Sequence, residues 1–235
     1  MSDLFGLWPH QEQAVTEIET AWKNKIKSVC LQLSTGGGKT RIIRTIVDNH
    51  AQSKKVIYVI AHRSTLVRQL SDELTEGGIK HGIIQAGCPY IKYRVQVCSI
   101  QTLVRRIDKL PEPEIIIIDE SHHSRSDTYQ KIIKVWRNAL MLGVTATPRR
   151  PDEKPMSDIF QKLVIGPPMR ELIDGKYLCD YDYYAPDTVN MDGVHKRGGE
   201  FVTSESQKRV DTKMIIGSAV DHYKKYADHK PAIAC

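Results

Sequence analysis

Three consecutive glycines stand directly before a lysine and a threonine in the stretch STGGGKT, from Ser34 to Thr40, and they restrict this chain more than any other feature. Ordering a glycine costs about 0.5 to 1 kcal/mol more than ordering an alanine, so a run of three indicates a backbone that turns tightly or approaches a bulky group. An apolar run, residues 28–33, precedes the glycines, and a helix-like run, residues 40–50, follows them. This context is typical of a phosphate-binding loop.

Strand-like and helix-like segments alternate along the chain. Further strands are predicted over 55–61, 95–99, 114–119 and 139–145, and further helices over 8–23, 64–75, 100–110 and 128–138, with Ser64 and Ser99 as N-caps. Runs such as Ile115 to Ile118 are continuous rather than alternating, which is typical of parallel strands covered on both faces. The sequence therefore predicts an α/β fold with an open, mostly parallel sheet, and ligands at the carboxyl ends of its strands.

In that topology STGGGKT has the form of a P-loop. Backbone N–H groups would bind the phosphates of ATP along Ser34, Thr35, Gly36, Gly37 and Gly38. Lys39 would reach the β- and γ-phosphates, and the Thr40 hydroxyl would bind Mg²⁺. The general pattern has glycine where this chain has Leu33. A plain glycine-rich turn is the alternative, and the strand before and helix after favour the phosphate site.

The stretch IIIIDESHH delivers two carboxylates at the end of another buried strand. Asp119 is predicted to hold Mg²⁺ and Glu120 to orient and deprotonate the attacking water. A purely structural interpretation makes Asp119 a helix N-cap, yet leaves unexplained why both motifs end strands of one sheet. His122 and His123 lack the cysteine cluster or spaced histidine of a zinc site.

Composition indicates a protein without a membrane span. No apolar run approaches about 18 residues, and the N-terminus has no signal-peptide pattern, so the expected location is the cytoplasm. Five cysteines are widely spaced and form no CxxC pair, which favours reduced thiols. A net charge of +6 is compatible with a polyanionic partner and does not establish one.

STGGGKT, DESHH and GVTATPRR follow one another in this order. With them the chain resembles the first RecA-like domain of a superfamily 2 helicase, the DEAD/DEAH-box type of nucleic-acid-dependent ATPase. AHRSTLVRQ, SIQTL and FQKLVIGPPMRELIDGKYLCDYDYYAPD are most similar to phage and DNA-repair helicases related to XPB and to restriction-enzyme motor subunits. The resemblance is strongest over Leu7 to Tyr184.

The resemblance implies roles for further residues. LWPHQ is similar to the adenine-reading Q-type motif, with Gln11 on the base edge and Trp8 where the motif has arginine. His122, at the position of the DEAH histidine, would link the nucleotide site to TAT. In that stretch Thr145 and Thr147 would couple hydrolysis to strand movement. With Lys39, Asp119 and Glu120, His122 completes the implied catalytic set.

AHRSTLVRQ and SIQTLVRR match the motifs that follow a nucleic-acid backbone. Arg63, Gln101 and Thr102 are the residues expected to contact phosphates, which position a strand without reading its bases. Three neighbouring arginines are better interpreted as solvated helix faces: Arg68, Arg105 and Arg106.

Family members need a second RecA-like domain that closes over the nucleotide and supplies an arginine finger. Its motifs do not occur in this sequence, and KPAIAC near the end resembles the first strand of such a domain. The expected organisation is a RecA-like ATP-binding domain over 1–184, a linker and helix over 185–228, and the start of a truncated second domain over 229–235. Residues 190–209 are polar and glycine-bearing, which favours a linker or loop.

The predicted function is the N-terminal half of an ATP-dependent helicase or translocase that moves along nucleic acid, DNA rather than RNA. Two alternatives remain open: a duplex-translocating subunit of a restriction or defence system, and a truncated, inert nucleic-acid-binding module. A small-molecule P-loop kinase is less favoured, because no acceptor-binding lid is seen and TATP would be unexplained.

Overall fold

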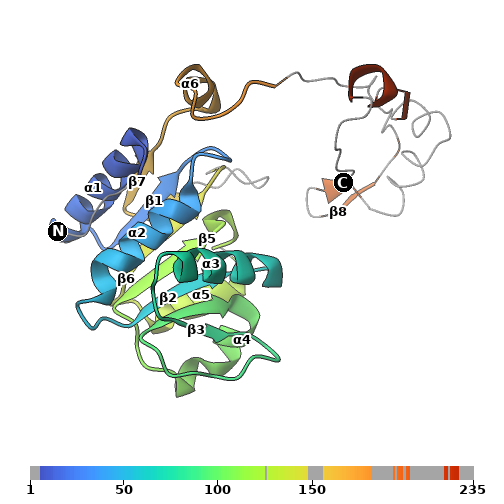
Figure 1. The fold of residues 1–235 in the computed structure, drawn as a ribbon. Helices are drawn as coiled ribbons and strands as arrows, with labels where there is room; N and C mark the ends of the chain where they lie inside the picture. The colour runs from blue at the N-terminus through green and yellow to red at the C-terminus, as the bar shows by residue number, and fades with distance from the viewer. Residues whose placement is uncertain are drawn as a thin grey trace. The chain divides into compact units, whose positions relative to one another are not determined.

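The computed structural model describes residues 6–124, 126–147 and 156–181, together with 193, 195–197, 200–201, 220–221 and 223–227. The chain divides into two compact units, Met1–Cys179 and Asp180–Cys235. The first unit is a sheet between two layers of helices (Figure 1), and it contains every predicted site residue. Among the described residues no helix is both long enough and apolar enough to cross a membrane.

Seven parallel strands form the sheet, in the order β3-β4-β2-β5-β6-β1-β7. They are β1 (Ser28–Gln32), β2 (Ile57–Ala61), β3 (Gly82–Ile84), β4 (Val95–Ser99), β5 (Ile115–Asp119), β6 (Leu140–Thr145) and β7 (Lys162–Ile165). The predicted parallel α/β sheet is confirmed. Gln32 pairs with Thr145, and Asp119 with Val144, so β1, β5 and β6 end at one edge. That register brings the P-loop, the DESHH stretch and the TAT stretch together.

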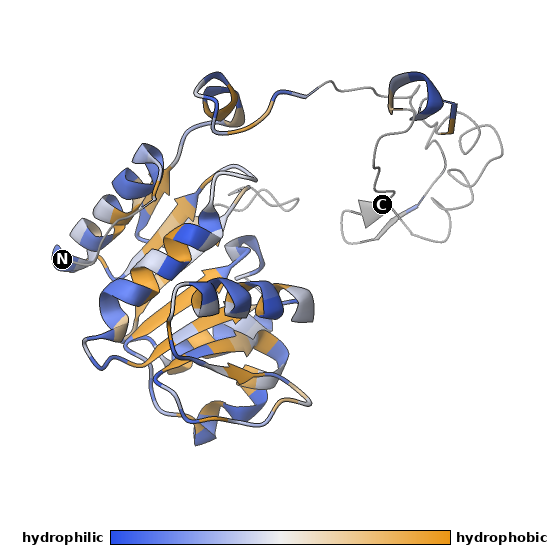
Figure 2. Cartoon of the chain, in the orientation of Figure 1, coloured by the Kyte–Doolittle hydropathy of each residue, from blue (hydrophilic) through white to orange (hydrophobic). Residues whose placement is uncertain are grey.

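Helices cover both faces of the sheet. On one face lie α1 (Pro9–Lys23), α2 (Lys39–Ala51) and α3 (Ser64–Glu76), and on the other α4 (Ile100–Arg106) and α5 (Asp127–Val135). Ile115 and Ile117 join the first hydrophobic core, whereas Ile116 and Ile118 join the second. The continuous apolar run is therefore buried on both sides. Figure 2 shows the same pattern, with orange strands between helices of mixed hydropathy.

Some predicted boundaries differ from the structure. Predicted helix 100–110 is α4 followed by a 3₁₀ turn (Ile107–Lys109), and a short helix, α6 (Met169–Asp174), lies in the proline-bearing stretch. The N-cap position of α3 is occupied by Arg63, and the predicted N-cap Ser64 is the first residue of the helix. Ser99 does occupy the N-cap position of α4, but its hydroxyl donates to Gln101 Oε1 at 2.7 Å and does not cap the helix. The last helix is predicted over about 211–226, and its part over 211–219 lies outside the described residues, as does the strand expected at the end of the sequence.

Within the second unit, two short strands pair in antiparallel fashion, β8 (Lys196–Arg197) and β9 (Glu200–Phe201). They fall in the segment predicted as a linker or loop. Residues 220–221 and 223–227 are helical, which agrees with the C-terminal part of the predicted last helix.

Candidate functional site

The P-loop connects β1 to α2, and its glycines are required by conformation and by packing. Gly36 and Gly38 have φ of +81° and +88°, which side chains rarely adopt. A Cβ on Gly38 would lie 2.1 Å from Gln11 Nε2, and one on Gly36 would lie 2.8 Å from Leu178 Cδ2. A Cβ on Gly37 would lie 2.8 Å from Cγ of Leu33, which is 1% exposed. Leucine at position 33 therefore fills the space beneath the loop.

Residues at the start of α1 hold the P-loop from one side. Gln11 is 3% exposed; its Nε2 donates to the Gly37 carbonyl at 2.9 Å, and its Oε1 accepts from the Trp8 backbone N–H at 3.0 Å. His10 Nε2 lies 3.1 Å from the same Gly37 carbonyl. Gln11 thus lies at the nucleotide loop with both ends of its amide bonded to protein. Its predicted contact with adenine stays a prediction.

Lys39 is the first residue of α2 and is half-buried. Its Nζ donates to the Leu33 carbonyl at 3.2 Å. Burial lowers the pKa of Lys39, while the nearby carboxylates of Glu120 and Asp119 act in the opposite direction. The lysine and both acidic residues therefore share one electrostatic environment. Thr40 is half-buried beside it, and Ser34 Oγ lies 3.4 Å from the Pro167 carbonyl, whereas Thr35 is exposed.

Asp119, the last residue of β5, has a raised pKa, and Glu120, which follows it, has an uncommon backbone conformation. Burial, and then the charge of Glu120, raise the pKa of Asp119 to about 6, although the Glu120 backbone N–H and Lys39 partly oppose the change. Glu120 has φ of +51° and ψ of +53°, a left-handed conformation that is strained for a residue with a side chain. Such strain and a buried carboxylate both disfavour folding, and both are common at functional sites.

His122 connects Glu120 to the end of β6. Its Nδ1 lies 3.2 Å from Thr145 Oγ1 and 3.2 Å from Glu120 Oε2. Thr145, fully buried, donates its hydroxyl to the Thr147 carbonyl at 3.0 Å and accepts the Thr147 N–H at 3.2 Å. Because the Thr145 proton is already used, the hydrogen in this contact belongs to His122 Nδ1. One N–H therefore joins the carboxylate to the TAT stretch.

Three histidine rings continue from this network toward the end of β2. The centroids of His122 and His123 are 4.1 Å apart, and those of His123 and His62 are 4.5 Å apart. Gln101 Nε2 donates to the His62 carbonyl at 2.9 Å. Burial, and then the charge of Arg63, lower the pKa of His62, which favours its neutral form. These contacts join the residues predicted to act in hydrolysis to the segment predicted to contact nucleic acid.

The predicted phosphate-contacting residues differ in accessibility. Arg63 and Gln101 are exposed, whereas Thr102 is only 9% exposed. Of the arginines interpreted as solvated, Arg68 and Arg105 are exposed and Arg106 is partly buried. A cleft of about 740 Å³ beside α3 is lined by residues that include Ser64, Thr65, Arg68, Gln85 and Cys88. This cleft begins next to Arg63.

The residues present fit a nucleoside triphosphate with Mg²⁺. Gly36 and Gly38 adopt positive φ angles that a residue with a side chain rarely adopts, as the tight turn of a phosphate-binding loop requires, and Lys39 supplies a cation next to them. Asp119 supplies a carboxylate, and Thr40 a hydroxyl, which are oxygen donors that Mg²⁺ prefers. The donor set therefore suits both the phosphates and the ion.

Sequence reasoning missed three residues of this site: His10, Tyr177 and Leu178. The Tyr177 ring packs on the rings of Trp8 and His10, with centroids 5.1 and 5.4 Å apart, and Leu178 packs against Gly36. His10 lies in α1, next to Gln11, whereas Tyr177 and Leu178 follow α6, far along the chain from the P-loop. The only available signal was the family resemblance of GPPMRELIDGKYL, which carries no information on contacts.

Fold and site together define a P-loop nucleoside-triphosphatase domain of the RecA-like type. Residues 4–150 match the family described as type III restriction enzyme, res subunit, and the chain belongs to that family. It is 26% identical over 203 residues to a 51.5 kDa protein of a Lactococcus phage (isolate 7-9), covering 86% of this chain and 42% of that protein. It is 25% identical over 221 residues to the DNA 3'-5' translocase XPB2 of Sulfurisphaera tokodaii, covering 88% and 48%.

Among solved structures, the UvsW helicase from bacteriophage T4 has a TM-score of 0.55 and 18% identity, over 68% of this chain and 60% of that chain. This likeness shows the shared fold. The chain spans less than half the length of both sequence relatives. Family and relatives identify it as an N-terminal domain of the superfamily 2 helicase type, near XPB-related and restriction-enzyme proteins, which confirms the resemblance.

Proposed function

We propose that this chain is the ATP-binding half of a DNA helicase or translocase motor that couples ATP hydrolysis to movement along a nucleic-acid strand. One observation carries the proposal: at one sheet edge, Lys39 shares an electrostatic environment with Asp119 and Glu120, and His122 joins Glu120 to Thr145. DNA as the substrate is supported by the relative described as a DNA translocase.

Each residue has a part in the proposed reaction. The backbone N–H groups of the P-loop and Lys39 bind the phosphates, and Glu120 orients and deprotonates the attacking water. Thr40 and Asp119 would hold Mg²⁺, which supplies charge neutralisation at the phosphates. His122 keeps the Glu120 carboxylate in place and passes changes there to Thr145. Arg63 and Gln101 contact the nucleic-acid backbone, and the contribution of the buried Thr102 is confined to packing unless α4 moves.

A second RecA-like domain is part of the proposal. Residues 1–184 would form the first domain, 185–228 a linker and helix, and 229–235 the start of the second. An arginine supplied in trans to the nucleotide accelerates related phosphoryl transfers by about 10³ to 10⁵. We therefore expect this chain alone to bind ATP and to hydrolyse it very slowly.

The test separates binding from turnover. Binding of a fluorescent ATP analogue should weaken by about ten- to a hundredfold in Lys39→Ala, because a charged hydrogen bond is lost. Glu120→Gln should retain binding and lose about 10² to 10⁴ in turnover. Turnover is measured with single- and double-stranded DNA and RNA, on this chain and on a longer version that carries a second RecA-like domain. If neither version hydrolyses ATP while the chain binds DNA, an inert binding module replaces the motor.

A duplex translocase of a restriction system is the second candidate, favoured by the family match to a restriction-enzyme subunit. Such a motor moves along duplex without separating its strands. A strand-displacement assay beside an assay for displacement of a third strand from a triplex distinguishes the two candidates, since only a helicase is positive in the first.

A further inference from the structure

Residues 90–94, the YIKYR segment, expose aromatic and cationic side chains together. Tyr90 is 43% exposed, Ile91 52% and Tyr93 41%, and Lys92 and Arg94 are exposed as well. Scattered apolar residues on a surface are ordinary, but three within four positions form a patch. The patch belongs to none of the motifs that define the nucleotide site.

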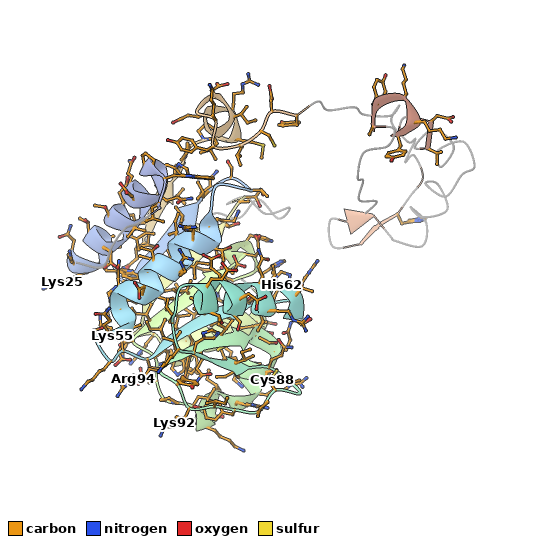
Figure 3. All side chains as sticks on the ribbon, viewed as in Figure 1. Lys25, Lys55, His62, Cys88, Lys92 and Arg94 are labelled. Carbon is orange, nitrogen blue, oxygen red and sulfur yellow. The ribbon has the colours of Figure 1, made fainter. Side chains whose placement is uncertain are left out.

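The YIKYR segment lies at the edge of the sheet opposite the P-loop. It directly precedes β4, whereas the P-loop, Glu120 and Arg63 follow the carboxyl ends of their strands. A five-residue strand separates the two edges by about 17 Å. Figure 3 labels Lys55, Arg94 and Lys92 along one side of the domain, away from His62.

Cations from the neighbouring strands lie beside this segment. Arg94 donates to the carbonyl of Lys54, which stands just before β2, and Lys80 stands just before β3. Since β2 and β3 both pair with β4, these residues enter the sheet on either side of the YIKYR segment. Lys54 and Lys80 are both exposed.

Few carboxylates oppose this positive charge. No Asp or Glu occurs in the 31 residues 77–107. The nearest acidic residues in the chain are Glu76, which ends α3, and Asp108, in the turn after α4. Glu112 and Glu114 precede β5, on the far side of β2, and one Glu114 oxygen already accepts the Val56 N–H at 2.7 Å. The patch is therefore suited to an anionic partner.

The backbone of the segment is fixed by a buried side chain. Gln96, 1% exposed, donates from Nε2 to the Ile91 carbonyl at 2.9 Å and to the Tyr93 carbonyl at 2.8 Å. The Tyr93 N–H also donates to the Ile91 carbonyl at 2.9 Å. A surface held in place in this way loses little entropy when it binds.

We propose that the YIKYR segment, with Lys54 and Lys80, is a second contact surface for an unpaired nucleic-acid strand. Exposed aromatic rings stack on bases of any sequence, and cations beside them follow the phosphates. A duplex offers phosphates without open base faces, so the tyrosines favour an unpaired strand. That the ligand is a nucleic acid rests on the proposed function. The YIKYR segment would hold the strand at the amino ends of the sheet strands, whereas Arg63 would contact it at their carboxyl ends.

Fluorescence anisotropy with labelled oligothymidine and with a blunt duplex tests this inference on the whole chain. Replacing both tyrosines, Tyr90→Ala with Tyr93→Ala, should weaken oligothymidine binding at least about tenfold and duplex binding much less. The Tyr90→Phe and Tyr93→Phe pair keeps the rings and should bind like the unmodified chain. Lys92→Glu should weaken binding and reduce its salt dependence. Lys27→Glu is the matched control, the same charge change at the same sheet edge before β1.

The outcomes separate this inference from the proposed function. If the alanine pair binds oligothymidine normally while Arg63→Ala weakens binding, the strand is held only at the carboxyl edge and this inference alone is overturned. If the unmodified chain binds no oligonucleotide, the inference and the nucleic-acid part of the proposed function fail together. Unchanged oligonucleotide binding, with tyrosine-dependent binding to phosphatidylserine vesicles, would overturn the inference in favour of a membrane surface.

Discussion

The imidazole Nδ1 of His122 lies 3.2 Å from the hydroxyl of Thr145, and this contact joins the DESHH stretch to the TAT stretch across two neighbouring strands. The same nitrogen lies 3.2 Å from a Glu120 carboxylate oxygen. In the proposed motor, a displacement of Glu120 during hydrolysis would therefore change the hydrogen bonding of Thr145. The Thr145 hydroxyl also bonds to both the carbonyl and the N–H of Thr147. The change would therefore reach the backbone that follows β6.

His122→Ala should leave ATP-analogue affinity within about twofold and lower nucleic-acid-stimulated turnover about tenfold, the effect of roughly one lost hydrogen bond. His122→Asn retains a donor close to the Nδ1 position and should restore much of the loss. Steady-state turnover with and without saturating DNA, in a version that carries a second RecA-like domain, measures both variants. Full stimulation in the alanine variant would show that the contact is only structural.

Gly38→Ala should destabilise the domain more than Gly87→Ala, although both glycines have a positive φ, +88° and +80°. A Cβ on Gly38 would meet Gln11 Nε2 at 2.1 Å and break its bond to Gly37, whereas no atom lies within 4 Å of a Cβ on Gly87. The Gly87 change therefore costs about 1 kcal/mol for backbone conformation, and the Gly38 change about 1 kcal/mol more. Denaturant unfolding followed by tryptophan fluorescence measures both, and equal losses would contradict the packing argument.

Asp119→Asn should stabilise the metal-free protein at neutral pH. The pKa of Asp119 is raised to about 6, so the folded state disfavours its charge. The group is neutral in both states below its unfolded pKa, and stability is lost as the pH rises through about 6. The substitution should therefore raise the free energy of unfolding by up to about 3 kcal/mol at about pH 8, and by little at about pH 4. Urea unfolding in EDTA is the measurement; an equal gain at both pH values would point to a different cause.

The fold could be predicted largely from local pattern. The uninterrupted apolar run Ile115 to Ile118 requires cover on both faces, and the structure divides these side chains between two cores. Once the strands are parallel, their carboxyl ends must share an edge. For this reason the loop containing Lys39 and the pair Asp119 and Glu120 could be placed together from sequence, and their shared electrostatic environment agrees with that placement.

Contacts between distant segments could not be predicted. β3 has only three residues, Gly82–Ile84, too few for a periodic signal. His10 and Leu178 contact the P-loop from opposite ends of the domain sequence, and no spacing of residues in the sequence predicts these contacts. Sequence resemblance also does not fix which side of a seven-residue helix is buried. Thr102 is 9% exposed in α4, and its expected contact with phosphate stays a prediction.

Cysteine labelling tests whether Cys30 and Cys98 are buried in the folded chain. Burial raises the pKa of the Cys30 thiol to about 11, and raises that of the fully buried Cys98 well above its usual range. Near pH 8 only about one Cys30 in a thousand is therefore a thiolate, the reactive form. Cys88 is half-buried and Cys179 is exposed. Iodoacetamide should modify Cys88 and Cys179 of the folded chain at least about a hundredfold faster than Cys30 and Cys98, as read by peptide mass spectrometry.

Unfolding the chain in guanidinium is the control for this labelling, because all five cysteines should then react at similar rates. Cys30 is also informative about the site, since its Sγ lies 3.8 Å from the hydroxyl of Ser121, the residue after Glu120. Rapid modification of Cys30 without denaturant would mean that β1 and the DESHH stretch separate readily. The close packing on which the proposed hydrolytic site depends would then be absent in solution.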